Sequence, residues 1–165
     1  MSKWSGNLTN RLEEGRQDKP ISIGDDITMY LWSDRKCYYV CEVVNQKKIK
    51  VRPYYVCADH SKEGGAGHQD WMYFKIWDNY NKYLSGFFPE HFNPEDHRDE
   101  PDPQIWVFRY GKWMQEYRHE EMKHPEFYSK REQDHFAKHG WFNTYHDLSG
   151  KVSFGVRDYY YDWEF

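Results

Sequence analysis

The feature that most constrains the fold of this chain is its supply of aromatic side chains. Of 165 residues, 33 are Trp, Tyr or Phe, whereas Leu, Ile and Val together number only 19. Each ring can bury about 150–250 Å², so complete burial of a third of them would supply the hydrophobic drive of an ordinary globular domain. Disordered chains are poor in rings and carry large net charges, and the net charge here is only −4. The sequence therefore predicts a folded chain whose interior is built largely from rings.

Length and patterning predict one domain. Residues 1–19 are polar and lack periodicity, which predicts a flexible N-terminal tail, and residues 20–165 then form a single β-rich domain. Within that domain, residues 79–103 and 118–149 interrupt the pattern of strands and are expected to be insertions. No apolar stretch approaches the length of a membrane span, so we expect a protein of the cytoplasm.

Alternation of apolar and polar residues predicts a series of short strands. Ile27, Met29 and Leu31 alternate with their neighbours, which is typical of a half-buried strand. A longer strand over residues 37–44 is followed by a turn and a return strand, in which Pro53 should mark an edge, a bulge or an end. The other predicted strands cover residues 71–77, 105–110, 112–117 and 152–156.

One helix interrupts the predicted strands. Ser129 and Glu132 fit a capping box and Gly140 can end a helix, so we expect a helix over about residues 130–139. Residues 79–88 are aromatic but irregular, and residues 89–103 hold too many prolines for regular structure. Five to seven short strands with one helical insertion predict a mainly-β fold, a small antiparallel barrel of the SH3 or Tudor type.

Nine histidines raise the question of a metal site. His119 and His124 resemble a zinc-protease motif, but their spacing places them about 140° apart on a helix, so they would not converge. His135 and His139 have the i, i+4 spacing that can bind zinc with a third ligand such as His146. The alternative, a solvated helical face, is the interpretation that we favour. We therefore predict no metal and no cofactor, with His135 and His139 as the weak candidates.

The other candidate motifs have simpler explanations. The glycine-rich loop at residues 64–67 lacks the Gly-Lys-Ser/Thr ending of a phosphate-binding loop. The polar residues around it are explained by loop composition; they are Asp59, His60, His68 and Asp70. The three cysteines are odd in number and lie in predicted strands, where burial as free thiols is usual; they are Cys37, Cys41 and Cys57. No catalytic residue is predicted.

Rings beside charged groups are the most promising binding feature. One such group lies at the end of the first predicted strand, and a second lies near the C-terminus. Aromatic faces with a few fixed charges suit protein interfaces, nucleotide stacking or cation–π capture, and they equally suit a ring-built core held by ion pairs. The candidate binding residues are Trp32, Asp34, Arg35, Arg157, Asp158 and Tyr159.

Several short motifs recur in an order that resembles a family of small uncharacterised proteins of tailed phages and prophages, many from gut bacteria. The motifs are Gly24-Asp25, Ser33-Asp34-Arg35, Glu42-Val43-Val44, Val107-Phe108, Gly111-Lys112-Trp113 and Gly155-Val156-Arg157-Asp158-Tyr159-Tyr160 with Asp162 and Phe165. Members of that family usually end in Tyr-Tyr-Asp-Pro-Ser-Phe, whereas Trp163 and Glu164 replace Pro-Ser here. The resemblance covers about half the chain and implies a viral accessory protein acting in an infected bacterial host.

Three functions stay open at this point. The first is a non-enzymatic accessory protein that binds a host protein, countering a bacterial defence system. The second is a domain that sequesters a nucleotide by stacking it between rings such as Trp32 and Tyr159. The third is a metal-dependent enzyme that uses His135 and His139. A nucleic-acid partner is disfavoured because no segment carries a basic field.

Overall fold

A computed structural model describes residues 20–31, 34–62, 70–91, 100–148, 151–155 and 157. The expected N-terminal tail lies outside these residues. The described residues form two antiparallel sheets and two α-helices, so the predicted mainly-β architecture is confirmed. In this part of the chain no helix is long and apolar enough to cross a membrane.

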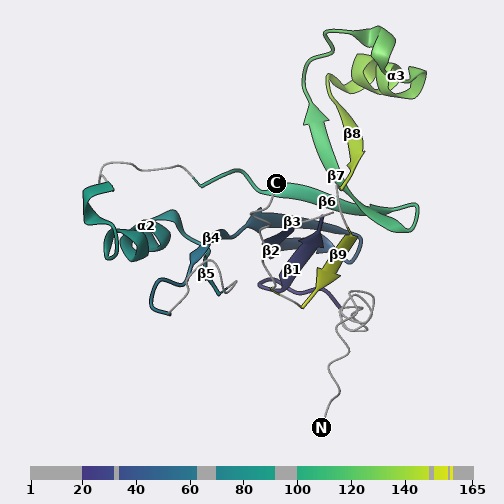
Figure 1. Cartoon of the computed structure of the whole chain (residues 1–165). Helices are drawn as coiled ribbons and strands as arrows, with labels where there is room; N and C mark the ends of the chain where they lie inside the picture. Colours follow the sequence, from purple (N-terminus) through teal and green to yellow (C-terminus); the bar gives the residue numbers. More distant parts are fainter. Residues whose placement is uncertain are drawn as a thin grey trace.

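Seven strands form the larger sheet (Figure 1). In order across the sheet they are β8 (Phe142–Asp147), β7 (Lys112–His119), β6 (Gln104–Arg109), β3 (Lys48–Pro53), β2 (Arg35–Asn45), β1 (Asp26–Tyr30) and β9 (Lys151–Phe154). A second sheet pairs β4 (Tyr55–Ala58) with β5 (Trp71–Phe74). The helical segments are α2 (Trp77–Ser85), η2 (Pro89–His91), η3 (Pro125–Phe127) and α3 (Lys130–His139).

Both predicted hairpins are confirmed. β2 and β3 are joined by a two-residue turn, and β3 ends at Pro53, which cannot donate a ladder hydrogen bond. β6 and β7 turn through Tyr110 and Gly111, whose φ angles of 52° and 77° are both positive. Positive φ at both central residues is typical of the hairpin turn that matches the twist of its strands.

The larger sheet curls strongly, but its ladders do not close into a barrel. β8 and β9 lie at opposite ends of the strand order, yet only three residues separate them in the chain. Four Cα steps span at most about 15 Å, whereas seven flat strands would span about 29 Å. The rings of Trp113 in β7 and Phe154 in β9 accordingly lie 5.4 Å apart. The expectation of a barrel is therefore corrected. Among the described residues no ladder joins the two ends of the sheet, and contacts between side chains hold them near each other.

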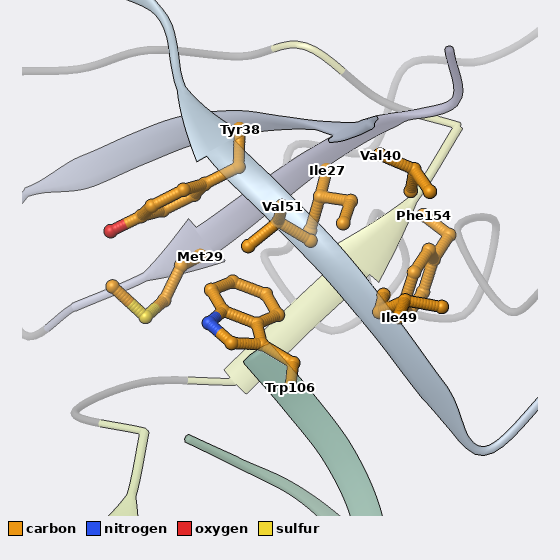
Figure 2. Close-up of a cluster of buried hydrophobic side chains, with 8 residues drawn as sticks. All are labelled: Ile27, Met29, Tyr38, Val40, Ile49, Val51, Trp106 and Phe154. Carbon is orange, nitrogen blue, oxygen red and sulfur yellow. The ribbon is translucent and has the colours of Figure 1, made fainter. Parts of the chain in front are cut away.

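The inside of this curl, its concave face, holds the main core (Figure 2). Its members are Ile27, Met29, Tyr38, Val40, Ile49, Val51, Trp106 and Phe154. Ile27, Val40, Ile49, Val51 and Trp106 are each 0% exposed. The scarce aliphatic side chains are thus concentrated in one cluster, and rings form only part of it.

β7 and β8 continue beyond the body of the sheet and carry α3 at their far end (Figure 1). We call residues 117–147 the arm. Its centre is Phe142, which is 1% exposed and packs against the rings of His119, Tyr128 and Phe136. α3 has the predicted bounds, with the capping box at Ser129.

The second helix, α2, corrects the expectation that residues 79–88 are irregular and that there is one helix. The N-cap residue that precedes the helix is Ile76, which provides no side-chain hydrogen bond, so the usual sequence signal for a helix start is missing. The helix instead packs its rings on those of the small sheet. Tyr80 and Tyr83 contact Phe74 at 6.0 and 5.3 Å between ring centroids. Packing between rings that are distant in the sequence therefore stabilises a helix that the local sequence does not predict.

Candidate functional site

The strand register decides which side chains face away from the main core. In β1, Ile27 and Met29 belong to the concave core, so Asp26, Thr28 and Tyr30 point to the opposite, convex face. Residues directly paired across an antiparallel ladder share a face. Tyr39 pairs with Asp26 and Arg35 pairs with Tyr30, which places both β2 side chains on the convex face.

Three tyrosines gather on this convex face. The ring of Tyr54 lies 5.1 Å from that of Tyr39 and 5.8 Å from that of Tyr73. Tyr54 follows directly after Pro53, and its amide donates to the carbonyl of Cys37 in β2. Since Tyr54 also leads into β4, it ties the small sheet, and with it Tyr73, to the larger one. The cluster joins residues that are far apart in the sequence.

Cationic side chains cap these rings. The Nζ of Lys75 lies 4.9 Å from the centre of the Tyr39 ring. The guanidinium of Arg157 lies 4.6 Å from the Tyr73 ring and 5.6 Å from the Tyr54 ring. Lys75 and Arg157 are both exposed. On the same face Arg35 lies over Tyr30 at 5.9 Å. We call this set the ring–cation surface: Tyr30, Arg35, Tyr39, Tyr54, Tyr73, Lys75 and Arg157.

The hydroxyls of Tyr54 and Tyr39 have raised pKa values and stay protonated at neutral pH. The hydroxyl of Tyr54 donates to Oδ1 of Asp26 at 2.5 Å. Burial, followed by this hydrogen bond and the charge of Asp26, raises the pKa of Tyr54, while Arg157 opposes the shift. Burial likewise raises the pKa of Tyr39. The charge of the surface is therefore set by its cations and by the carboxylate of Asp26.

One neighbouring cation is already neutralised by the chain itself. Arg52, which pairs with Tyr39 across β2 and β3, forms an ion pair with Glu100. Glu100 belongs to the acidic, proline-rich stretch of residues 89–103. Within the described residues, no such ion pair is recorded for Lys75 or Arg157. These two exposed cations, held on rings, are suited to bind an anionic group.

The predicted binding residues divide into two sets. Arg35 and Arg157 both lie on the ring–cation surface, each over a tyrosine ring. The carbonyl of Asp34 accepts a hydrogen bond from the Leu31 amide in the β1–β2 connection. The remaining three predicted residues lie outside the described residues: Trp32, Asp158 and Tyr159. The sequence did not single out Tyr39, Tyr54 or Tyr73, because tyrosines in predicted strands are usually core residues. Lys75 was also missed, because no motif surrounds it.

The histidine candidates are only partly brought together. His135 and His139 lie side by side on α3, with 4.4 Å between ring centroids. His146, the suggested third ligand, instead contacts Tyr117 at 5.0 Å and Thr144 Oγ1 at 3.3 Å. No group of three or more His, Cys, Asp or Glu side chains in the described residues could hold a metal ion.

Asp59 organises its own loop. It is 7% exposed, and Oδ1 accepts hydrogen bonds from the amide and the hydroxyl of Ser61 and from the hydroxyl of Tyr83. The Ser61 hydroxyl is the main cause that lowers the pKa of Asp59. His60 packs on Phe87 and Phe88, and His68 lies outside the described residues. In the described part of this loop the contacts of Asp59 are those of a structural carboxylate.

All three cysteines are free thiols, as predicted. Cys37 and Cys57 are buried, and Cys41 is half-buried. Burial raises the pKa of Cys57 to about 11 and also raises the pKa of Cys41. A thiol with a raised pKa holds little thiolate at neutral pH, and the thiolate is the nucleophile. Cys41 and Cys57 are thus in environments that suppress their reactivity.

Comparison of the chain with protein-family models, with curated proteins and with solved structures gave no match.

Proposed function

We propose that the protein is a non-enzymatic binding module of a tailed phage or prophage, and that it engages a host protein through the ring–cation surface. The observation that carries the proposal is the stacking of two exposed cations, Lys75 and Arg157, on three clustered tyrosines. Tyr and Arg are among the residues that dominate protein interfaces. Binding of such a partner would counter the host's defence or otherwise serve infection, as the resemblance to phage accessory proteins implies.

The chemistry of the surface indicates an acidic contact on the partner. A cation held over a ring is already oriented, so less side-chain entropy is lost when it meets a carboxylate. Buried neutral tyrosines around it exclude water and strengthen that contact. Arg52 and Glu100 provide a precedent within the chain, because an acidic side chain is bound at the border of the same surface.

The test is capture of partners from bacterial lysate with charge-reversed variants. Lys75→Glu combined with Arg157→Glu should reduce recovery of the specific partner at least tenfold in quantitative mass spectrometry. The matched control is Lys130→Glu combined with Arg131→Glu, which changes the charge equally on exposed positions of α3. Equal recovery by both double variants would contradict the proposal.

A nucleotide ligand is the second candidate, and the same pairing of ring faces with exposed cations favours it. A base would stack on a tyrosine while Lys75 or Arg157 bound a phosphate. A nucleotide that binds the folded chain should raise its melting temperature by mass action. At a ligand concentration of a hundred times Kd, the gain in the free energy of unfolding is about 2.7 kcal/mol. Thermal shift against cyclic oligonucleotides and ADP-ribose derivatives distinguishes the two. A shift that Lys75→Glu with Arg157→Glu abolishes would replace the protein partner with a nucleotide.

A further inference from the structure

α3 places two imidazoles in direct contact at the far end of the arm. His135 and His139 are one helical turn apart, and their ring centroids lie 4.4 Å apart with 37° between the ring planes. This end of the molecule is distant from the ring–cation surface, because the arm carries α3 away from the body of the sheet (Figure 1). The pair is therefore independent of the function proposed above.

A nitrogen of this pair has no partner among the described residues. Nε2 of His135 is shielded from solvent and accepts or donates no hydrogen bond within that part of the chain. A buried polar atom left unsatisfied costs about 1–3 kcal/mol, so native structures rarely keep one without a reason. A ligand that accepted the lone pair of this nitrogen would recover that cost. His139 is exposed, which leaves access to the pair from solvent.

The helix that holds the two rings is fixed at both ends. Ser129 and Glu132 form a reciprocal capping box, and Gly140 ends α3 with a left-handed φ of 75°. Nε2 of Gln133 donates to the carbonyls of Pro125 and Tyr128, which anchors the first turns to the preceding segment. Two ligands on so constrained a helix lose little freedom when a metal binds.

Trp141 fixes the ring of His135 from the side. Its indole meets the His135 ring edge-on at 4.6 Å, and the guanidinium of Arg118 lies over the same indole at 4.7 Å. Arg118 thus adds a positive charge beyond Trp141, which weakens but does not block binding of a cation. The rings are held by packing and not by hydrogen bonds to each other.

The separation of the rings allows them to share one metal ion. With a metal–nitrogen bond of about 2.0–2.1 Å, each ring centroid lies about 3.2 Å from the metal. Two imidazoles at right angles about the ion are then about 4.5 Å apart, and two at the tetrahedral angle about 5.2 Å apart. The observed 4.4 Å is close to the right-angle value, so both rings can reach one ion. Imidazole sites bind Cu²⁺ and Ni²⁺ more tightly than the earlier first-row divalent ions, and Cu²⁺ more tightly than Zn²⁺.

We propose that His135 and His139 form a two-imidazole site for a divalent transition-metal ion, with Cu²⁺ or Ni²⁺ preferred and water completing the coordination. Imidazole is a good ligand for these ions, and a pair at i, i+4 on a helix can chelate one ion. The site needs no third side chain from the described residues, because His139 is exposed and water can reach the ion there.

The experiment uses the full-length chain without an affinity tag. Calorimetric titration with CuCl₂ and NiCl₂ should show one tight site per chain, and electron paramagnetic resonance of the Cu²⁺ form should show splitting from two nitrogens. His139→Gln and His135→Gln should each weaken binding at least tenfold. His124→Gln, an exposed position outside α3, is the matched control and should leave binding unchanged.

Three results would overturn the proposal. They are the absence of saturable binding, binding that neither α3 substitution weakens, and Zn²⁺ binding more tightly than Cu²⁺. Substitution of His135 removes its contact with Trp141 and can therefore also lower the stability of the arm. His139→Gln is exposed and keeps the fold, so it decides the outcome if the two variants differ.

Discussion

The two faces of the seven-stranded sheet are built from the same strands but in opposite ways. On the concave face, Ile27, Val40, Ile49 and Val51 are fully buried around Trp106. On the convex face, β1 and β2 present tyrosines whose rings carry cations, and Lys75 and Arg157 remain exposed. Both faces bury apolar side chains, but the convex face also keeps cations exposed above its buried tyrosines.

This difference separates stability from recognition. Apolar burial contributes about 25 cal/mol per Å², and five side chains of the concave cluster are 0% exposed. Cation–π pairs at exposed sites contribute only about 0.5–1 kcal/mol each. The exposed cations of the convex face can therefore be changed at modest cost to the fold, as a binding surface requires, whereas the concave cluster cannot.

The largest expected effect is on the concave face. Trp106→Ala removes the largest fully buried side chain and should lower the free energy of unfolding by about 3–5 kcal/mol. Urea denaturation followed by circular dichroism measures it. Phe127→Ala is the control, since Phe127 is 79% exposed and its loss should change stability by less than about 0.5 kcal/mol. Similar losses in both variants would break the comparison.

A smaller effect is expected at the short, part-buried hydrogen bond between Tyr54 and Asp26 on the convex face. Tyr54→Phe removes the donor to Asp26 and leaves that carboxylate without its hydroxyl partner. The loss should be about 1–3 kcal/mol in the same urea assay. Tyr110→Phe is the matched control, because Tyr110 is 86% exposed. An unchanged stability of Tyr54→Phe would mean that water replaces the hydroxyl.

Alkaline pH should sharpen the role of Tyr54. Its folded-state pKa is raised above the ordinary value of 10.0, so the unfolded chain loses this proton first. The stability that Tyr54 contributes is thus present below pH 10 and falls as pH rises above it, by up to about 1.4 kcal/mol per pH unit. Tyr54→Phe should have a shallower alkaline limb than the native chain. Buried Tyr38 on the concave face keeps some slope in the variant, because its pKa is also raised.

Local signals were sufficient where the structure is local. The capping box at Ser129 and the glycine at position 140 predicted α3, and Pro53, expected at an edge, a bulge or an end, ends β3. α2 was not predicted because Ile76 gives no cap and the helix depends on rings of β5. The expectation of a barrel was wrong because alternation predicts which side chains point to the core. It does not predict whether the two end strands, β8 and β9, form a ladder with each other.

The sequence predicted only some of the residues of the candidate site. Arg35 and Arg157 stood out because each is a cation beside rings in the chain. The rings that they contact in space could not be paired with them by periodicity, since Tyr54 and Arg157 are separated by most of the chain. Lys75 gave no signal at all. Its role depends on how β5 is carried over the convex face.

The measurement that tests the account most directly is the stability of a chain without the two exposed cations. Lys75→Ala combined with Arg157→Ala should lower the free energy of unfolding by only about 1.5–3 kcal/mol, because each of the three ring contacts of these cations contributes about 0.5–1 kcal/mol. Urea denaturation of this variant beside the native chain gives the value. A loss of about 4 kcal/mol or more, equal to that of Trp106→Ala, would contradict the account, because the cations would then hold the fold together.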